Sequence, residues 1–431
     1  MKLLKSFSIY TIASFVNKGM MFAIIPFLTN AISPEQNGIL SLYGVFVLFV
    51  IPFALLGFPN SIIIEYSKMG KSEYKSFFSS SLFLSTISFI VLLIIFLFAG
   101  NLTSSFIGVP YKLLLMGIFY IYFNLFFEGI LSYIRTINKP YIFVSVSFFK
   151  NLLELTLIIF LVLRSKMEAE GKVISGVIAG LAVTVYAIIF FYRKGLLTTN
   201  IKKKYITAEL KFGIAQLFFQ FNLFVLSSAD KFLIGYLLHD KVGLGVYFVA
   251  NQFAYIINVL VTAFFFSYQP ILYNFLSNLT LENKYKIVRI KYIFIGFLFI
   301  CTLLLCIATP LFYKLFINEA YQSGIPYVAL TAFAYFFWGL YALFLGYLYY
   351  YRKNKAVLLF SVFSIIICVA LNYILISEYK IMGAAYANLL TYFILFIAIF
   401  VTVSKVFKLN FPWFDYKILF GNDKIINSNK I

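Results

Sequence analysis

The chain has 431 residues, of which 63% are hydrophobic and only 12% are charged. Soluble domains are about half apolar and about a quarter charged, so this composition excludes a water-facing fold and makes lipid the solvent for most of the chain. The formal net charge is +20, but the basic residues lie between apolar runs rather than in a separate basic domain. The charge therefore indicates membrane topology, and we expect no nucleic-acid partner.

Twelve apolar runs are long enough to cross a membrane as helices, each of which needs about 20 residues. Strands of a membrane barrel would be about ten residues long with alternating hydrophobicity, a pattern that is absent here. Pro26 and Pro52 lie inside the first two runs and predict kinks there. The sequence thus predicts an all-α membrane protein with about 12 transmembrane helices at 6–28, 38–58, 76–99, 111–134, 141–163, 173–192, 208–229, 243–266, 292–312, 326–350, 356–376 and 383–404.

The distribution of Lys and Arg predicts the orientation. With the N-terminus inside, 24 of them lie on the inner side, including four at 284–291, while 8 lie on the outer side and three within helices. Positive charge favours the cytoplasmic side, so we expect both termini to be cytoplasmic. An even number of spans requires the same arrangement of the two ends.

The most basic internal connection, at 193–207, carries five Lys and Arg and separates the sixth predicted helix from the seventh. We therefore expect an N-terminal six-helix lobe at 1–195, a basic cytoplasmic linker at 196–207, a C-terminal six-helix lobe at 208–404 and a cytoplasmic interfacial tail at 405–431. Corresponding helices begin similarly, with Asn138-Lys139-Pro140 in one half and Asn354-Lys355-Ala356 in the other. This similarity indicates two parallel, pseudo-symmetric repeats.

No catalytic or metal-binding motif stands out in the sequence. There is no GxSxG motif, the three cysteines have no metal or redox spacing, and the lone His239 cannot form a cluster. The loops are too short for a soluble catalytic domain. We therefore expect a transporter rather than an enzyme, with no metal and no cofactor.

Ionisable residues at membrane depth are costly, and by default they mark a transport pathway or a charged partner. Lys18 lies near the middle of the first predicted helix, beside Asn17. Lys150 and Glu154 are one turn apart in the fifth predicted helix, where they either line a pathway or simply neutralise each other. Lys18 lies too deep to reach the interface easily, so it calls for an anion.

A polar stripe follows helical spacing along the fourth predicted helix and consists of Asn124, Glu128, Ser132 and Arg135. Arg135 can equally be a cytoplasmic anchor at the helix end. Amides recur in the seventh and eighth predicted helices, where they either line a cavity or tie helices together. These amides are Gln216, Gln220, Asn222, Asn251, Gln252 and Asn258.

These residues suit a substrate with an anionic head and a sugar. Phosphate would meet the cations Lys18, Lys150 and Arg135. Sugar hydroxyls would meet polar cavity residues, for which the candidates are Asn17, Asn124, Asn222 and Asn251. Glu128 or Glu154 could titrate and couple transport to an ion.

Several segments resemble the polysaccharide-biosynthesis (O-antigen) flippases of the multidrug/oligosaccharidyl-lipid/polysaccharide exporter superfamily. Their order along the chain is more specific than any one of them. The segments are 228–236 (SADKFLIGY), 242–247 (VGLGVY), 133–140 (YIRTINKP), 319–321 (EAY) and 382–387 (MGAAYA).

The resemblance implies two six-helix lobes around a central cavity, working by alternating access in the bacterial cytoplasmic (inner) membrane. It implies an undecaprenyl-pyrophosphate-linked oligosaccharide, a repeat unit of O-antigen, capsule or exopolysaccharide, moved from the inner to the outer leaflet. Membrane lipid, a polysaccharide polymerase and a chain-length regulator are the partners that it suggests. The alternatives are a multidrug exporter of the same superfamily, whose cationic cargo Lys18 and Lys150 would repel, and a membrane glycan polymerase or ligase, which would need a larger external loop.

Overall fold

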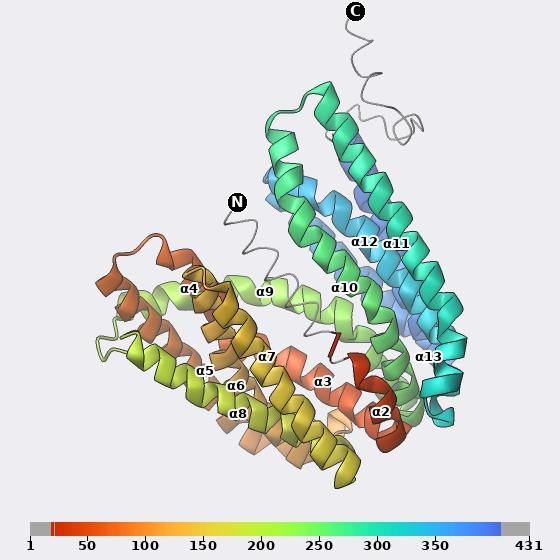
Figure 1. The fold of residues 1–431 in the computed structure, drawn as a ribbon, viewed down its shortest axis with the longest axis horizontal. Coiled ribbons are helices and arrows are strands. Elements are labelled where there is room, and N and C mark those ends of the chain that lie inside the picture. Colours follow the sequence, from red (N-terminus) through yellow and green to blue (C-terminus); the bar gives the residue numbers. More distant parts are fainter. Residues whose placement is uncertain (1–18, 21, 407–431) are drawn as a thin grey trace, which may run out of the picture. The chain divides into compact units, whose positions relative to one another are not determined.

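The computed structural model describes residues 19–406 apart from residue 21, and within that part every regular element is a helix (Figure 1). Contacts divide the chain into two compact units. Unit 1 comprises Met1–Val249, Phe316–Ser323 and Ile376–Ile381. Unit 2 comprises Ala250–Leu315, Gly324–Leu375 and Met382–Ile431. The division into lobes at 196–207 remains a prediction.

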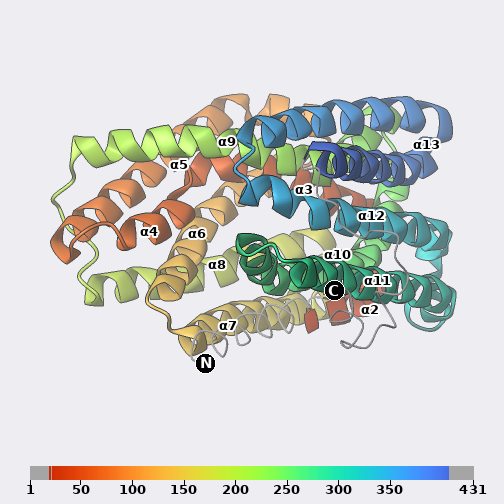
Figure 2. The ribbon, with the colours of Figure 1, turned by 90° about the horizontal axis from the view of Figure 1, so that it is seen from above.

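Unit 1 is built around α6. This helix packs against α3, α4, α5 and α8, and it lies between α5 and α8 in both views of the ribbon (Figures 1 and 2). The elements of the unit are α2 (Ile25–Ala31), α3 (Pro34–Leu55), α4 (Phe58–Tyr66), α5 (Lys71–Ile107), α6 (Tyr111–Thr136), α7 (Pro140–Ile158), the π-helical η1 (Ile159–Arg164), α8 (Glu168–Arg193), α9 (Lys203–Leu233), the π-helical η2 (Ile234–Leu238) and the start of α10 (Lys241–Ser277).

Aromatic rings fill the core where α4, α5, α6 and α8 meet. Phe58, Phe78 and Phe191 are fully buried, and the ring centroid of Phe78 lies 5.4 Å from that of Phe58 and 4.9 Å from that of Phe191. Edge-on pairs of this kind add roughly 0.5–1.5 kcal/mol each beyond the area they bury. The short helix α4 is therefore held firmly at its first residue.

Unit 2 contains the rest of α10, α11 (Leu281–Phe316) up to Leu315, α12 (Ile325–Tyr350) and most of α13 (Asn354–Val406). The 3-10 helix η3 (Glu319–Gly324) precedes α12 and belongs to unit 1 up to Ser323. Helix α12 contacts the other three. A Cβ at Gly339 would lie 2.8 Å from both Leu298 of α11 and Val261 of α10. On α12 the Phe337 ring lies 5.0 Å from that of Phe393 on α13.

Ten helical elements in the described residues are long and apolar enough to span a membrane. The last, Asn354–Lys405, contains two of the predicted spans, because its backbone leaves the helical conformation at Lys380 (φ 55°, ψ −135°). The first predicted span, 6–28, lies mostly outside the described residues. The all-α membrane fold predicted from the sequence is confirmed.

The surface of the long helices is apolar, as lipid requires. Phe98 in α5 is 88% exposed, and Leu102 of the same helix and Ile307 of α11 are each 75% exposed. Side chains of this kind on a water-facing surface would promote aggregation. Such exposed apolar side chains suit helix surfaces that face acyl chains.

The expected kink at Pro52 is a full break in the helix. Helix α3 ends at Leu55, Leu56 and Gly57 both take positive φ angles of 45° and 78°, and α4 begins at Phe58. Proline removes a backbone donor and glycine tolerates the left-handed conformation, so the chain can turn here between two helices. The predicted span 38–58 therefore ends earlier than expected.

Tyr321 fastens η3 to the beginning of α3. Its hydroxyl accepts a hydrogen bond from Asn37 Nδ2 (2.5 Å) and donates one to the carbonyl of Ile32 (2.7 Å). The tyrosine is 1% exposed and the asparagine 3%. The Glu-Ala-Tyr segment at 319–321 is thus a structural tie within unit 1.

Candidate functional site

The break between α3 and α4 forms one wall of a cavity in unit 1. Helix α9 packs closely against the break. A Cβ added at Gly57 would lie 3.0 Å from the ring of Phe212 on α9. Glycine at 57 is required both by this approach and by its positive φ. The close packing brings side chains from the break, from α6 and from α9 around one space.

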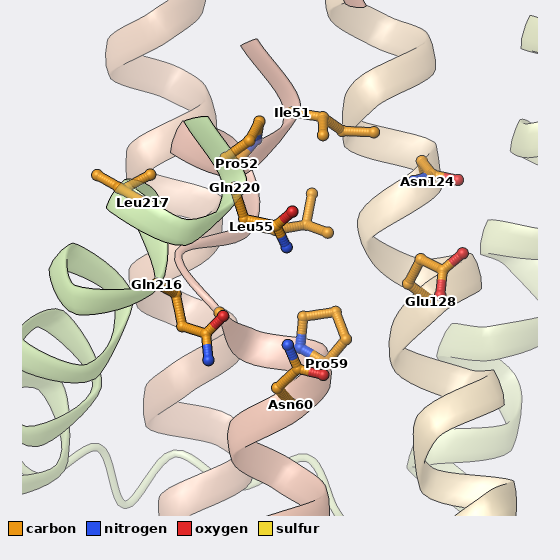
Figure 3. A pocket seen from close by; sticks show the side chains of 11 residues that line it. Ile51, Pro52, Leu55, Pro59, Asn60, Asn124, Glu128, Gln216, Leu217 and Gln220 are labelled. Atoms are coloured by element: carbon orange, nitrogen blue, oxygen red, sulfur yellow. The ribbon is translucent and has the colours of Figure 1, made fainter. Parts of the chain in front are cut away.

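The cavity has a volume of about 260 Å³. Its apolar lining comes mainly from the end of α3. Its polar lining comes from three elements, and Figure 3 shows the amides of α4 and α9 directed toward the space between the helices. The polar residues are Asn60 on α4, Asn124 and Glu128 on α6, and Gln216 and Gln220 on α9.

These five side chains make no hydrogen bond with any other residue that the structure describes. Each amide carries both donors and acceptors, and the carboxylate of Glu128 is an acceptor. Polar groups in a membrane bundle are normally paired with one another, because unsatisfied groups are costly there. Four amides and one carboxylate around a cavity are therefore suited to a neutral, hydroxyl-rich ligand.

Glu128 also lies within electrostatic reach of the positive charges of Arg135 and Lys150. Arg135 is exposed in the last turn of α6, with its guanidinium carbon 5.4 Å from the centre of the Phe143 ring. A cation in the last turn of a helix is favoured by the helix dipole. At this position Arg135 can bind a phosphate group, or it can anchor the end of α6 at the membrane surface.

Lys150 is paired with Glu154 across one turn of α7. The Lys150 Nζ donates to Glu154 Oε2 at 2.8 Å, and the two side chains are only 10% and 15% exposed. The ammonium also lies 5.3 Å from the centre of the Phe127 ring and 5.9 Å from that of Tyr120, contacts that favour a cation. In this arrangement the positive charge of Lys150 is largely satisfied inside unit 1.

The remaining candidates from the sequence lie elsewhere. Lys18 and Asn17 are outside the described residues. Asn222 is buried on α9 but does not line the cavity. Asn251 lies in unit 2, where its Oδ1 accepts a hydrogen bond from the hydroxyl of Tyr335 (3.1 Å). The structure thus brings Asn124 and Glu128 together with two amides of α9, and it places Lys150 with Glu154.

Sequence reasoning missed three polar residues. Asn60 follows Gly57 and Pro59, a pair that marks a turn even inside an apolar run. Glu209 is 1% exposed between α4, α5 and α9, and no local pattern signals this burial. Lys291, counted above with an inner connection, is 2% exposed and donates to the hydroxyl of Tyr347 at 2.9 Å.

No cluster of three or more His, Cys, Asp or Glu side chains able to hold a metal ion occurs among the described residues. The polar lining of the cavity consists of amides and one carboxylate, and ammonium and guanidinium groups lie within electrostatic reach of that carboxylate. Such groups can bind and orient hydroxyls and phosphates, or carry protons.

A scan against protein families matches residues 3–275 to the family described as polysaccharide biosynthesis protein. A search of curated proteins finds no match. Among solved structures, the lipid II flippase MurJ in an inward closed conformation is similar, with a TM-score of 0.70 at 15% identity over 95% of this chain and 95% of that one.

Two MATE transporter structures are also similar. An inward-facing multidrug resistance MATE family transporter of the MOP superfamily gives a TM-score of 0.69 at 12% identity, covering 93% of this chain and 99% of that one. The Vibrio cholerae MATE transporter VcmN in its bent form gives 0.54 at 14% identity, covering 94% and 98%. At these identities the similarity shows a shared fold.

Proposed function

The chain belongs to the polysaccharide biosynthesis protein family, and from this premise we propose that it is a flippase for a lipid-linked oligosaccharide. The substrate is an undecaprenyl-pyrophosphate-linked repeat unit of O-antigen, capsule or exopolysaccharide. The protein moves it from the inner to the outer leaflet of the bacterial cytoplasmic membrane by alternating access of two six-helix lobes. Both termini face the cytoplasm.

The cavity of unit 1 is the observation that carries this proposal. The amides of Asn60, Asn124, Gln216 and Gln220 make no hydrogen bond with another described residue, so their donors and acceptors can bind the hydroxyl groups of a sugar. The cavity volume of about 260 Å³ is slightly below the range of about 300–1,000 Å³ that is usual for small-molecule pockets. This volume suits one or two sugar rings, while the lipid chain stays in the bilayer.

The pyrophosphate calls for cations near the sugar site. Arg135 and Lys18 are the proposed ligands, and Lys150 joins them when its pair with Glu154 separates. The fold shared with a lipid II flippase supports a lipid-linked cargo. An exporter of organic cations would need an excess of negative charge at its site, whereas the single carboxylate of the cavity, Glu128, lies near two cations.

Further parts of the proposal concern partners and ion coupling. Membrane lipid surrounds the protein, and a polysaccharide polymerase and chain-length regulator use the product. The protein itself carries no catalytic activity. Glu128 and Glu154 remain proposed sites of ion coupling.

The proposal is tested with the full-length protein in liposomes that contain a fluorescent undecaprenyl-pyrophosphate-linked disaccharide. A membrane-impermeant quencher reports how fast the inner-leaflet pool becomes accessible.

Gln216→Leu removes an amide from the cavity wall and should slow this rate at least about tenfold, roughly the worth of one lost hydrogen bond to a buried group. Gln36→Leu makes the same chemical change on the first turn of α3, away from the cavity, and should leave the rate unchanged. Equal rates in both variants would contradict the assignment of the cavity, and uptake of ethidium without movement of the labelled lipid would indicate the exporter.

A further inference from the structure

A buried carboxyl group on α9 joins three helices of unit 1. The Oε1 of Glu209 lies 2.8 Å from Ser61 Oγ on α4, and its Oε2 lies 3.0 Å from Ser81 Oγ on α5. The glutamate is 1% exposed, and both serines are buried as well. Among the described residues no Lys or Arg forms an ion pair with it. A buried carboxylate without a cation is costly, whereas the neutral acid is not.

The hydrogen bonds around Glu209 fit the neutral acid. Ser61 has one hydroxyl proton, yet its Oγ lies within hydrogen-bonding distance of both Glu209 Oε1 and the carbonyl oxygen of Phe58 (3.1 Å). Both contacts are satisfied when Glu209 donates its proton to Ser61 Oγ and Ser61 donates to the carbonyl. Ser81 then donates to Oε2. With the proton on Glu209 Oε1, each hydrogen bond of this network joins one donor to one acceptor.

The charged groups on the neighbouring helices are engaged elsewhere. On α4, Glu65 forms an ion pair with Lys68 (2.8 Å). On α5, Glu73 accepts hydrogen bonds from Tyr205 Oη (2.8 Å) and from Lys204 Nζ (3.3 Å). None of the other basic or tyrosine groups on α4, α5 and α9 bonds to Glu209; they are Tyr66, Lys71, Tyr74, Lys75, Lys203, Lys211 and Lys231, the last of which pairs with Asp230.

Two of the helices that hold Glu209, α4 and α9, also line the cavity. Ser61 is the next residue after Asn60, which lines the cavity on α4. Gln216 lies on the cavity wall, seven residues after Glu209. Seven residues are about two helical turns, a rise of about 10.5 Å in total, so both side chains lie on the same face of α9. Between them, Gly213 lies against the backbone of Leu56 at the break. A movement of α4 away from α9 would therefore widen the cavity and break the Ser61–Glu209 contact at the same time.

We propose that Glu209 is a proton-binding site that is loaded while α4 and α9 are packed together and discharged when they separate. On separation water reaches the carboxyl group, the O–H bond of the acid breaks, the proton passes to water, and a hydrated carboxylate remains. When α4 packs against α9 again, the carboxylate of Glu209 takes up a proton from water. The link to transport rests on the proposed flippase function, but the presence of the proton does not.

Infrared spectroscopy tests for the proton itself. In the full-length protein at neutral pH, in a detergent that carries no ester group, the carbonyl stretching band of a protonated carboxylic acid should be present and should lose intensity in Glu209→Gln. The glutamine preserves the packing, because its amide donates to Ser61 and its carbonyl accepts from Ser81. The control Glu73→Gln removes a carboxylate that is about half exposed and paired with Lys204, and it should leave the band intact. A band that is absent, or that persists unchanged in Glu209→Gln, would overturn the proposal.

The coupling is tested separately with the fluorescent lipid-linked disaccharide. A pH gradient should accelerate its translocation by the native protein, and Glu209→Gln should reduce that acceleration while Glu73→Gln keeps it in full. If the native protein moves no lipid but shows the acid band, the proposed function fails and the proton site stands. If Glu209→Gln responds to the gradient like the native protein, the coupling through Glu209 is refuted.

Discussion

Replacing Gly213 by alanine should loosen the contact between α9 and the break at Leu56. A Cβ at this position would lie 2.9 Å from the carbonyl carbon of Leu56 and closer still to its oxygen, inside the 3.0 Å that real Cβ atoms keep. The obstacle is backbone and cannot rotate away. Overpacking of this kind costs up to about 3 kcal/mol, and alanine returns about 1 kcal/mol of helix propensity, so the net loss of stability is about 2 kcal/mol.

The matched control is Gly296→Ala on α11, where an added Cβ meets nothing within 4 Å. It should raise stability by up to about 1 kcal/mol through helix propensity alone. Denaturant unfolding of the full-length protein in detergent, followed by fluorescence, measures both. Because Gly213 lies between the cavity and Glu209, its variant should also slow lipid translocation. If the two variants were equally stable, the close packing of α9 on the break would be wrong.

Three other predictions follow from the same contacts. Lys150→Met leaves Glu154 buried and unpaired and should cost about 3–5 kcal/mol, whereas the exchange Lys150→Glu with Glu154→Lys should preserve folding; loss of transport with normal expression in the exchanged protein would show a role beyond pairing. Tyr321→Phe leaves the amide of Asn37 without its acceptor and should destabilise the protein by about 1–3 kcal/mol in denaturant unfolding, and unchanged stability would refute the structural role of that hydroxyl. Lys18→Ala should lower translocation of the lipid-linked disaccharide without lowering the protein level, and full activity would count against anion binding there.

The membrane helices were predictable because lipid imposes a single rule on every span. About 20 apolar residues are needed to cross, and the predicted run 76–99 lies within α5, which the structure extends to Lys71–Ile107. The break at Leu56 and Gly57 was not predicted, since hydropathy averages over a turn of two residues. The kink at Lys380 lies between two predicted runs, so a composition rule was enough to separate them.

The site was predictable only where its residues share one helix. Asn124 and Glu128 are four residues apart, and helical spacing places both on the same face of α6, where they line the cavity. Glu209 depends on Ser61 and Ser81, which are 148 and 128 residues away in the sequence. Partners at such distances are set by the packing of α4, α5 and α9, which no local pattern records.

We propose above that this protein carries a saccharide across the bilayer on its lipid anchor. The most direct measurement compares vesicles containing only the purified protein with protein-free vesicles, both loaded with fluorescent undecaprenyl-pyrophosphate-linked disaccharide. We expect the inner-leaflet pool to reach an external quencher in the presence of the protein and to stay protected without it. Equal protection of that pool in both preparations would refute the proposed flippase function.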